Sequence, residues 1–443
     1  MKNKIQQYYL CLLSFIILSS CSINVNRKPP NVILIMVDDM GVEALGSYGN
    51  LLNSTPNIDK MASSGILFKN CISQPLCTPS RVKIMTGSYN YRNYNHFGHL
   101  NSDQYTFGNL FQEKGYATCI AGKWQLNGLS YKDEIIDWQD SSRPHHFGFD
   151  EYSLWQLSKP RNEGERFANP LIEQNGKTLP RDNNQYGPDV FSQFVLDFIE
   201  RKHNGPFFVY YPMVLVHAPF VPTPDSEEWK TESKRYKNDT AYFKDMVEYT
   251  DKIVGKINTK LEELNIEDET IVIFTADNGT HPNIYSTTNY GIIQGGKGRT
   301  TNAGTHVPLI INWKGQIKES FEYDELIDFN DFYATFYDLT SNNEIELDGK
   351  SFLKFLNGEK KHVVRETVFV HYDPKWNENI NKHRNQFART KRYKLYQDGS
   401  FYDLKEDVLE LNKLAEDSLT ENERLIKEKL EYEISQHPKW THE

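Results

Sequence analysis

The chain is poor in cysteine and carries no excess of basic charge. Five cysteines in 443 residues do not suggest the disulfide framework of a small secreted domain. A net charge of −10 argues against a nucleic-acid partner, because proteins that bind nucleic acids carry a basic surface. Internal repeats and low-complexity tracts are also absent. A hydrophobic content of 38% fits a folded protein with a large core.

The sequence also lacks an apolar run long enough to cross a bilayer as a mature helix. Two lysines precede a short apolar run, Tyr8 to Leu18, which predicts a signal peptide over residues 1–20. The following Ser19-Ser20-Cys21 resembles a bacterial lipobox, and this resemblance implies a lipid on Cys21. A plain signal peptide is the alternative. We therefore expect an exported, membrane-anchored lipoprotein, periplasmic or at the cell surface, with residues 22–30 as a tether.

Strands and helices alternate along the first part of the chain. Residues 31–37 and 270–275 are nearly continuous apolar runs, as expected for strands buried on both faces. Shorter strands are predicted at 117–121 and 207–211, and apolar residues at helical spacing predict a helix over 239–264. This alternation predicts an α/β fold with a mainly parallel sheet, in which ligands bind beyond the carboxyl ends of the strands.

The character of the sequence changes near residue 340. Beyond it we predict short strands and a charged helix, which together favour a small antiparallel sheet with a helix packed on it: 367–371, 393–396, 401–404 and 420–435. We therefore divide the mature chain into a main domain, residues 31–340, and a C-terminal subdomain, residues 345–443.

Polar side chains follow both of the long apolar strands. Asp38 and Asp39 come directly after the first strand, and Asp277 and Asn278 come after the second. Oxygen ligands without histidine select Ca²⁺ or Mg²⁺. For a single pair, helix capping or turn formation would be the simpler explanation. Two such pairs predict a divalent metal site at this edge of the sheet.

The segment Cys77-Thr78-Pro79-Ser80-Arg81, followed by Met85-Thr86-Gly87, resembles the C-x-P-S-R…T-G signature of type I sulfatases. In that family a formylglycine-generating or sulfatase-maturating enzyme oxidises the cysteine to Cα-formylglycine (3-oxoalanine). The resemblance runs from about Asn31 to Ala415. It implies an alkaline-phosphatase-like α/β/α sandwich, a catalytic main domain and a smaller C-terminal α+β subdomain with a short antiparallel sheet and a helix.

The resemblance also implies a ligand set and a mechanism. The converted Cys77 and four oxygen ligands would bind one divalent cation, generally Ca²⁺: Asp38, Asp39, Asp277 and Asn278. One hydroxyl of the hydrated aldehyde would attack sulfur and expel the substrate alcohol, and sulfate would then leave by carbon–oxygen cleavage. Arg81, four residues after Cys77, would share its helix face and stabilise the negative charge.

Three further elements resemble family motifs. Gly122-Lys123-Trp124-Gln125 is similar to G-K-W-H, which implies that Lys123 binds a sulfate oxygen. Gln125 departs from the usual histidine, and glutamine cannot take a proton at neutral pH. His217-Ala218-Pro219 matches H-x-P, where the histidine is the general acid. Lys297, within a glycine-rich turn, matches a lysine that contacts the sulfate and the leaving oxygen.

We therefore expect hydrolysis of a sulfate monoester, on a sulfated polysaccharide or oligosaccharide because export suits polysaccharide breakdown. Weaker candidates for contacts with the substrate lie in loops or at strand ends: Arg92, His96, His99, His281, Arg299 and His371. One alternative is a phosphoester or phosphonate hydrolase of the same superfamily. The other, motivated by Gln125, is a non-catalytic pseudo-sulfatase that binds sulfated glycans. Whether Cys71 and Cys119 pair is left open.

Overall fold

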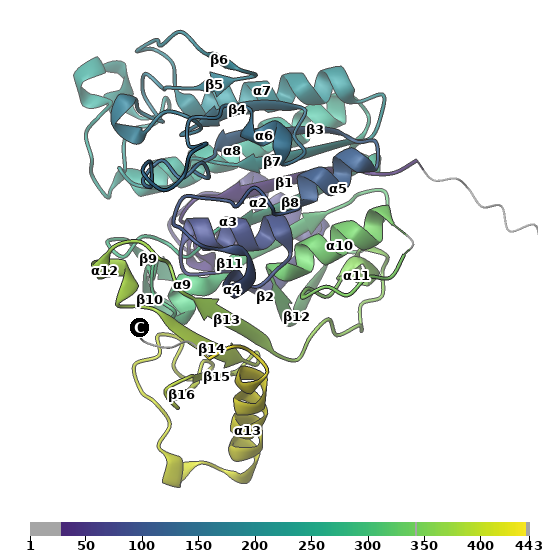
Figure 1. The fold of residues 1–443 in the computed structure, drawn as a ribbon, viewed down its shortest axis with the longest axis vertical. Helices are drawn as coiled ribbons and strands as arrows, with labels where there is room; N and C mark the ends of the chain where they lie inside the picture. The colour runs from purple at the N-terminus through teal and green to yellow at the C-terminus, as the bar shows by residue number, and fades with distance from the viewer. Residues whose placement is uncertain (1–27, 342, 440–443) are drawn as a thin grey trace, which may run out of the picture.

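The computed structural model of the chain describes residues 28–341 and 343–439. The predicted signal peptide, Cys21 and most of the tether lie outside these residues. Within the two described ranges, no helix is both long and apolar enough to cross a membrane. Figure 1 shows a large central sheet with helices around it, and a small sheet with one helix at the C-terminal end.

The central sheet has ten strands and is mixed. In spatial order they are β12 (Phe321–Asp328), β2 (Ile66–Ile72), β11 (His306–Asn312), β8 (Thr270–Ala276), β1 (Asn31–Val37), β7 (Phe207–Pro212), β3 (Ala117–Lys123), β4 (Glu151–Trp155), β5 (Glu173–Gln174) and β6 (Lys177–Thr178). Neighbours from β8 to β4 pair in parallel, whereas β11 runs antiparallel to both β8 and β2. The parallel centre brings the carboxyl ends of β8, β1 and β7 to one edge.

Two groups of helices cover the central sheet (Figure 1). In one group, α8 (Tyr242–Glu263) packs on α2 (Pro56–Ser64) and on α7 (Gly187–Lys202). In the other, α10 (Asn330–Thr340) packs on α3 (Cys77–Thr86) and on α5 (Phe107–Glu113). Short helices and a hairpin connect these elements: α4 (Asn90–Asn93), α6 (Arg143–His146), α9 (Asn302–Thr305), α11 (Leu353–Leu356), β9 (Tyr285–Thr288) and β10 (Gly291–Gln294).

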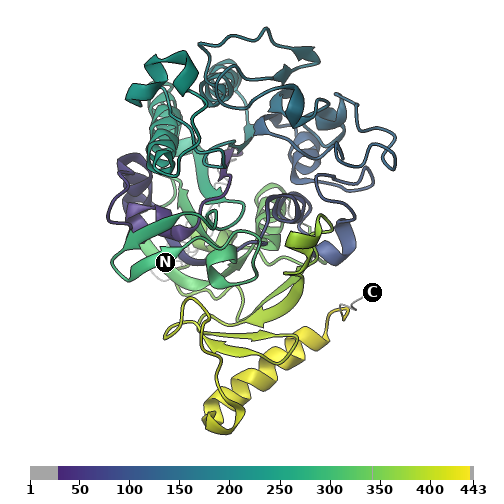
Figure 2. The same cartoon turned by 90° about the vertical axis from the view of Figure 1, so that its left-hand side faces the viewer.

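The C-terminal part contains a second, four-stranded antiparallel sheet. Its strands are β13 (Val368–Tyr372), β14 (Asn385–Arg389), β15 (Tyr393–Tyr396) and β16 (Phe401–Asp403), with α12 (Glu378–Asn381) between β13 and β14. Helix α13 (Glu421–Ser435) packs on β14 and β15, as Figure 2 shows from the side. The prediction of a short antiparallel sheet with a packed helix is therefore confirmed.

The elements that position the site follow the sequence pattern. Every residue of β1 and of β8 is buried, which explains their continuous apolar runs. In α8 the predicted apolar stripe faces inward, with Met246, Ile253 and Ile257 fully buried. This helix begins at Tyr242, three residues after the predicted start. Beyond residue 342, Phe352 and Phe355 pack into the main core, and the small sheet begins only at Val368.

Candidate active site

The two acidic pairs lie side by side because β1 and β8 are parallel neighbours. The Asp277 N–H donates to the Val37 carbonyl at 2.9 Å, and the Asp39 N–H donates to Asp277 Oδ1 at 3.1 Å. Asp39 has a φ of 64°, a left-handed conformation that ends the strand at this point. All four side chains at these strand ends, including those of Asp38 and Asn278, are buried.

Cys77 lies at the first turn of α3 and reaches the same strand ends. Ligand atoms of Asp38, Cys77 and Asp277 all lie within 4.8 Å of one another. The Cys77 side chain is 3% exposed, and burial raises the pKa of its thiol even though Lys123 opposes the shift. A thiol with a raised pKa is a poor nucleophile. The geometry therefore brings the motif cysteine to the acidic cluster without activating it as a thiolate.

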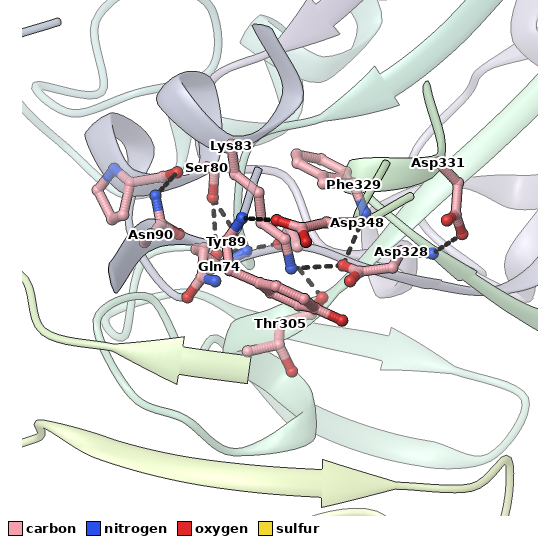
Figure 3. A network of polar contacts seen from close by, with 12 residues as sticks. Gln74, Ser80, Lys83, Tyr89, Asn90, Thr305, Asp328, Phe329, Asp331 and Asp348 are labelled. Carbon is pink, nitrogen blue, oxygen red and sulfur yellow. Dashed lines mark hydrogen bonds and ion pairs between the residues drawn. The ribbon is translucent and has the colours of Figure 1, made fainter. Parts of the chain in front are cut away.

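Helix α3 is buried along its whole length and is fixed by polar contacts, which Figure 3 shows. The Ser80 hydroxyl donates to the Gln74 carbonyl at 3.0 Å and accepts the Gln74 N–H at 3.1 Å. Asn90 donates to a carbonyl of the helix at 2.9 Å. Lys83 and Asp328 form an ion pair of 2.6 Å in which both side chains are 0% exposed. These contacts lock the helix that carries Cys77 against α4 and β12.

We expect Lys83→Met to lower the free energy of unfolding by about 3–5 kcal/mol, because Asp328 is left buried without its cation. Urea denaturation measures the change. Lys314→Met is the matched control, since Lys314 forms an exposed pair with Glu267 at 2.9 Å and its loss changes stability little. Equal losses in the two variants would contradict the role of the buried pair.

The charge balance of the cluster favours a bound cation. Burial and the charge of Asp38 raise the pKa of Asp277 well above its ordinary value. Burial opposes ionisation of Asp38 as well, but Lys123, Lys297 and Arg166 outweigh it and lower the pKa of Asp38. The neighbouring cations therefore keep Asp38 ionised but do not offset the burial of Asp277 and its repulsion by Asp38, and a divalent ion would keep Asp277 ionised as well.

Unpaired oxygen atoms also fit a metal. Asp38 Oδ1 and Asn278 Oδ1 are buried and have no hydrogen-bond partner among the described residues. The amide nitrogen of Asn278 donates to Asp39 Oδ1 at 2.9 Å, which leaves its oxygen free for another ligand. A buried polar atom without a hydrogen-bond partner destabilises the folded state unless a bound ion or water molecule supplies the missing contact. The donors are oxygens, which suit a hard cation such as Ca²⁺ or Mg²⁺.

Two lysines and a histidine surround this cluster. Lys123 Nζ contacts Asp38 Oδ2 at 2.7 Å, and Lys297 Nζ contacts Asp39 Oδ2 at 2.5 Å. His217 Nε2 lies 3.7 Å from Asp39 Oδ2, while Nδ1 is 2.6 Å from the carbonyl of the next residue. When Nδ1 carries a proton and donates it to this carbonyl, the ring is held with Nε2 facing the acidic cluster. Burial, followed by the charge of Lys297, lowers the pKa of His217 well below its ordinary value.

Arg81 and Gln125 contact the end of β3. The Arg81 guanidinium donates to the carbonyls of Lys123 and Trp124, so it holds the segment that carries Lys123. Gln125 has a φ of 48°, and its N–H donates to the Gln156 carbonyl at 3.0 Å. The Gln125 Oε1 atom is buried without a partner in the described part of the chain. The contact that we expect from Arg81 to the converted Cys77 stays a prediction.

The weaker candidates separate into two groups. His281 and Arg299 flank the Lys297 loop, and burial and Lys297 lower the pKa of His281. Three of the others have partners outside the acidic cluster: Arg92 pairs with Asp348 at 2.9 Å, His96 lies 3.8 Å from Glu134, and His371 bonds Gln386 at 2.6 Å. Both ring nitrogens of His99 are buried without a hydrogen-bond partner among the described residues, and burial and Arg143 lower its pKa to about 4. Cys71 and Cys119 are both free, which answers the question of their pairing.

Sequence reasoning missed Arg166. Its side chain is 1% exposed, lies 4.4 Å from the centre of the Trp155 ring, and donates to the Ala218 carbonyl at 2.8 Å. That carbonyl also contacts His217 Nδ1, so Arg166 helps to fix the histidine loop. No motif in the surrounding sequence marks this arginine, because only the fold brings it beside His217.

Comparison with known proteins agrees with this geometry. The sulfatase family profile matches residues 30–342, and a profile described as N-sulphoglucosamine sulphohydrolase, C-terminal, matches residues 299–438. The chain resembles a solved structure of BT4656 in complex with its substrate D-glucosamine-2-N,6-O-disulfate, with a TM-score of 0.73 and 23% identity. That alignment covers 92% of this chain and 98% of the other, and it shows the shared fold.

Curated relatives are similar in sequence over most of this chain. The N-acetylgalactosamine-6-sulfatase of Canis lupus familiaris is 31% identical over 342 residues, which cover 70% of this chain and 62% of that protein. The arylsulfatase of Hemicentrotus pulcherrimus is 31% identical over 358 residues, 74% of this chain and 62% of that protein. The chain thus spans less than two thirds of their length. Because the family profile covers more than half of the sequence and includes the Cys77 motif, the chain belongs to the sulfatase family.

Proposed function

We propose that this chain hydrolyses a sulfate monoester of a carbohydrate. The reaction would use a bound Ca²⁺ ion together with a formylglycine made from Cys77. The observation that carries the proposal is the convergence of Cys77 with Asp38 and Asp277 at the ends of two neighbouring strands, within 4.8 Å. The sulfatase names of the relatives support the reaction class. The sulfated glucosamine bound by the solved neighbour supports a sulfated sugar as substrate.

The strand-end residues would hold the cation: Asp38, Asp39, Asp277 and Asn278. Bound there, Ca²⁺ would neutralise charge on the sulfate oxygens and favour ionisation of the attacking hydroxyl. The aldehyde would require a formylglycine-generating or sulfatase-maturating enzyme as a partner.

The chain's own cations would bind and orient the ester. Lys123 and Lys297 both direct Nζ into the cluster, where charge-assisted hydrogen bonds would hold sulfate oxygens. The contact between Nδ1 of His217 and the Ala218 carbonyl would keep Nε2 turned toward the cluster. In its protonated form, which the negative charge of a bound sulfate ester would favour, His217 would donate the Nε2 proton to the leaving oxygen as the general acid.

We expect Gln125→His to raise turnover of 4-nitrophenyl sulfate at least about tenfold, because a general base typically contributes more than that. The reason is that the glutamine amide cannot accept a proton from the second hydroxyl of the hydrated aldehyde, the one that does not attack sulfur. Gln156→His is a matched control, since Gln156 also has a positive φ and a buried Oε1 without a partner among the described residues. An unchanged rate in Gln125→His would show that the base lies elsewhere.

Two assays test the proposed function against its alternatives. Turnover of 4-nitrophenyl sulfate is compared with that of 4-nitrophenyl phosphate, and we expect the sulfate ester to be preferred. A large preference for phosphate would support a phosphoester hydrolase. A pseudo-sulfatase would instead retain sulfated glycan affinity, yet release no sulfate even after Cys77 is converted.

We also propose that the protein is exported and lipid-anchored through Cys21, which lies outside the described residues. The support is the apolar run followed by Ser19-Ser20-Cys21. Incorporation of labelled palmitate into the wild type, and its loss in Cys21→Ala, would test this anchor. Equal labelling of the two proteins would refute it.

A further inference from the structure

Residues 373–384, which we call the strap, join β13 to β14 and begin beside Cys77. The strand that precedes the strap ends at Tyr372, which is 1% exposed. Tyr372 belongs to the same buried apolar cluster as Cys77 and Phe97. The C-terminal sheet therefore delivers the strap to the immediate neighbourhood of the reactive residue.

Hydrogen bonds fix one end of the strap to the loops that follow α4 and β3. The Tyr94 hydroxyl donates to the Pro374 carbonyl at 2.5 Å, and Lys375 Nζ donates to the Tyr94 carbonyl at 3.1 Å. From the loop after β3, the Tyr131 hydroxyl donates to the Lys375 carbonyl at 2.7 Å. Three hydrogen bonds of this kind hold the strap in one position rather than leaving it as a free loop.

The other end of the strap reaches the loop that carries Lys297. A Cβ added at Gly298 would lie 3.4 Å from Ile380 Cδ1, so the strap packs against this glycine. Burial, Lys382 and Arg299 all lower the pKa of His383, which places Arg299 close to this end. The strap thus contacts both the loop that carries Tyr94 and the loop that carries Lys297.

Trp376 lies on the strap with a large part of its side chain exposed. It is 43% exposed, while its ring stacks on Phe97 with centroids 4.2 Å apart and planes 10° apart. Phe97 is 5% exposed and shares its apolar cluster with Cys77. The indole is therefore rigidly supported on one side and open to solvent elsewhere. Aromatic faces of this kind pack against the C–H face of sugar rings, and aromatic side chains line ligand sites generally.

We propose that the strap forms one wall of the substrate site and that Trp376 stacks on a sugar ring of the sulfated substrate. This inference rests on the proposed function and names the residue that binds the carbohydrate part of the ester. The sulfate group would lie with Lys123 and Lys297, whereas the sugar would lie against the strap. Trp376 is accordingly a specificity residue that takes no part in the covalent chemistry.

Steady-state kinetics of Trp376→Ala test the proposal on a panel of N- and O-sulfated saccharides. The panel includes N-acetylgalactosamine 6-sulfate and D-glucosamine-2-N,6-O-disulfate. We expect KM for the saccharide to rise about tenfold with kcat nearly unchanged, because losing one well-packed aromatic contact typically costs that much affinity. Inhibition by inorganic sulfate should not change, since it reports on the cationic residues alone. Trp376→Phe should restore most of the affinity.

Tyr432→Ala is the matched control, because Tyr432 is an aromatic residue that is 68% exposed and lies on α13 rather than on the strap. An unchanged KM in Trp376→Ala would overturn the proposal. So would a parallel fall of kcat and of inorganic sulfate binding, which would indicate collapse of the strap. Wild-type turnover of aryl sulfates but of no saccharide would overturn it as well. Absence of sulfate release from every ester would instead refute the proposed function itself.

Discussion

Cys77→Ala should release sulfate at least about ten-thousandfold more slowly than the matured wild type, because alanine lacks the thiol that maturation needs to form the aldehyde, and hence the attacking hydroxyl. The fold should survive, since the substitution removes one small side-chain atom while the polar contacts of α3 remain. Sulfate release is measured directly, and the midpoint of thermal unfolding reports on the fold.

Cys119→Ala is the control for this experiment. Cys119 is also free and fully buried, but it lies within β3 rather than at the acidic cluster. This variant should keep most of the activity. Substantial residual turnover in Cys77→Ala, with the aldehyde shown to be absent, would mean that another group attacks sulfur.

Removal of divalent cations should abolish turnover and lower the thermal unfolding midpoint. Without a cation, the Asp38 charge acts on buried Asp277, and two buried oxygens lack partners among the described residues. A ligand present at 100 to 1,000 times its Kd stabilises the folded state by about 3–4 kcal/mol, so its loss should be readily measured. Activity and midpoint are recorded after EGTA treatment, and again after Ca²⁺ is added back.

Asp38→Asn provides a second test of the same site, with Asp225→Asn as its matched control. Asp38 lies in the cluster, whereas Asp225 is exposed and pairs with Lys252 at 2.7 Å. We expect Ca²⁺ to stop shifting the unfolding midpoint in Asp38→Asn and to keep its effect in Asp225→Asn. A chelated wild type that retains full activity would exclude the cation from the reaction.

The centre of the fold could be predicted because its elements have strong local patterns. The runs that form β1 and β8 are buried on both faces, and α8 has an apolar stripe at helical spacing. Parallel pairing then places Asp38 and Asp277 at the same edge. Cys77 reaches that edge only through tertiary packing of α3, so its position depended on the motif rather than on periodicity.

Other elements have weaker local signals. Strand β11 contains Pro308, which lacks an N–H, and the pairing with β2 shifts register between Val307 and Leu309. Strand β2 interrupts its apolar run with exposed Lys69, so it resembles a surface segment. Arg166 and Trp376 have no motif at all. Each matters because of the residues that the fold brings beside it, and those neighbours cannot be identified from local sequence patterns.

The most direct test of the account is whether turnover depends on the aldehyde at position 77. Preparations made with increasing amounts of a maturating enzyme are analysed by peptide mass, which gives the fraction of Cys77 converted, and each is assayed for sulfate release in saturating Ca²⁺. We predict that turnover per molecule rises in proportion to the converted fraction and extrapolates to zero for the unconverted thiol. Turnover that is the same at every level of conversion would contradict the account.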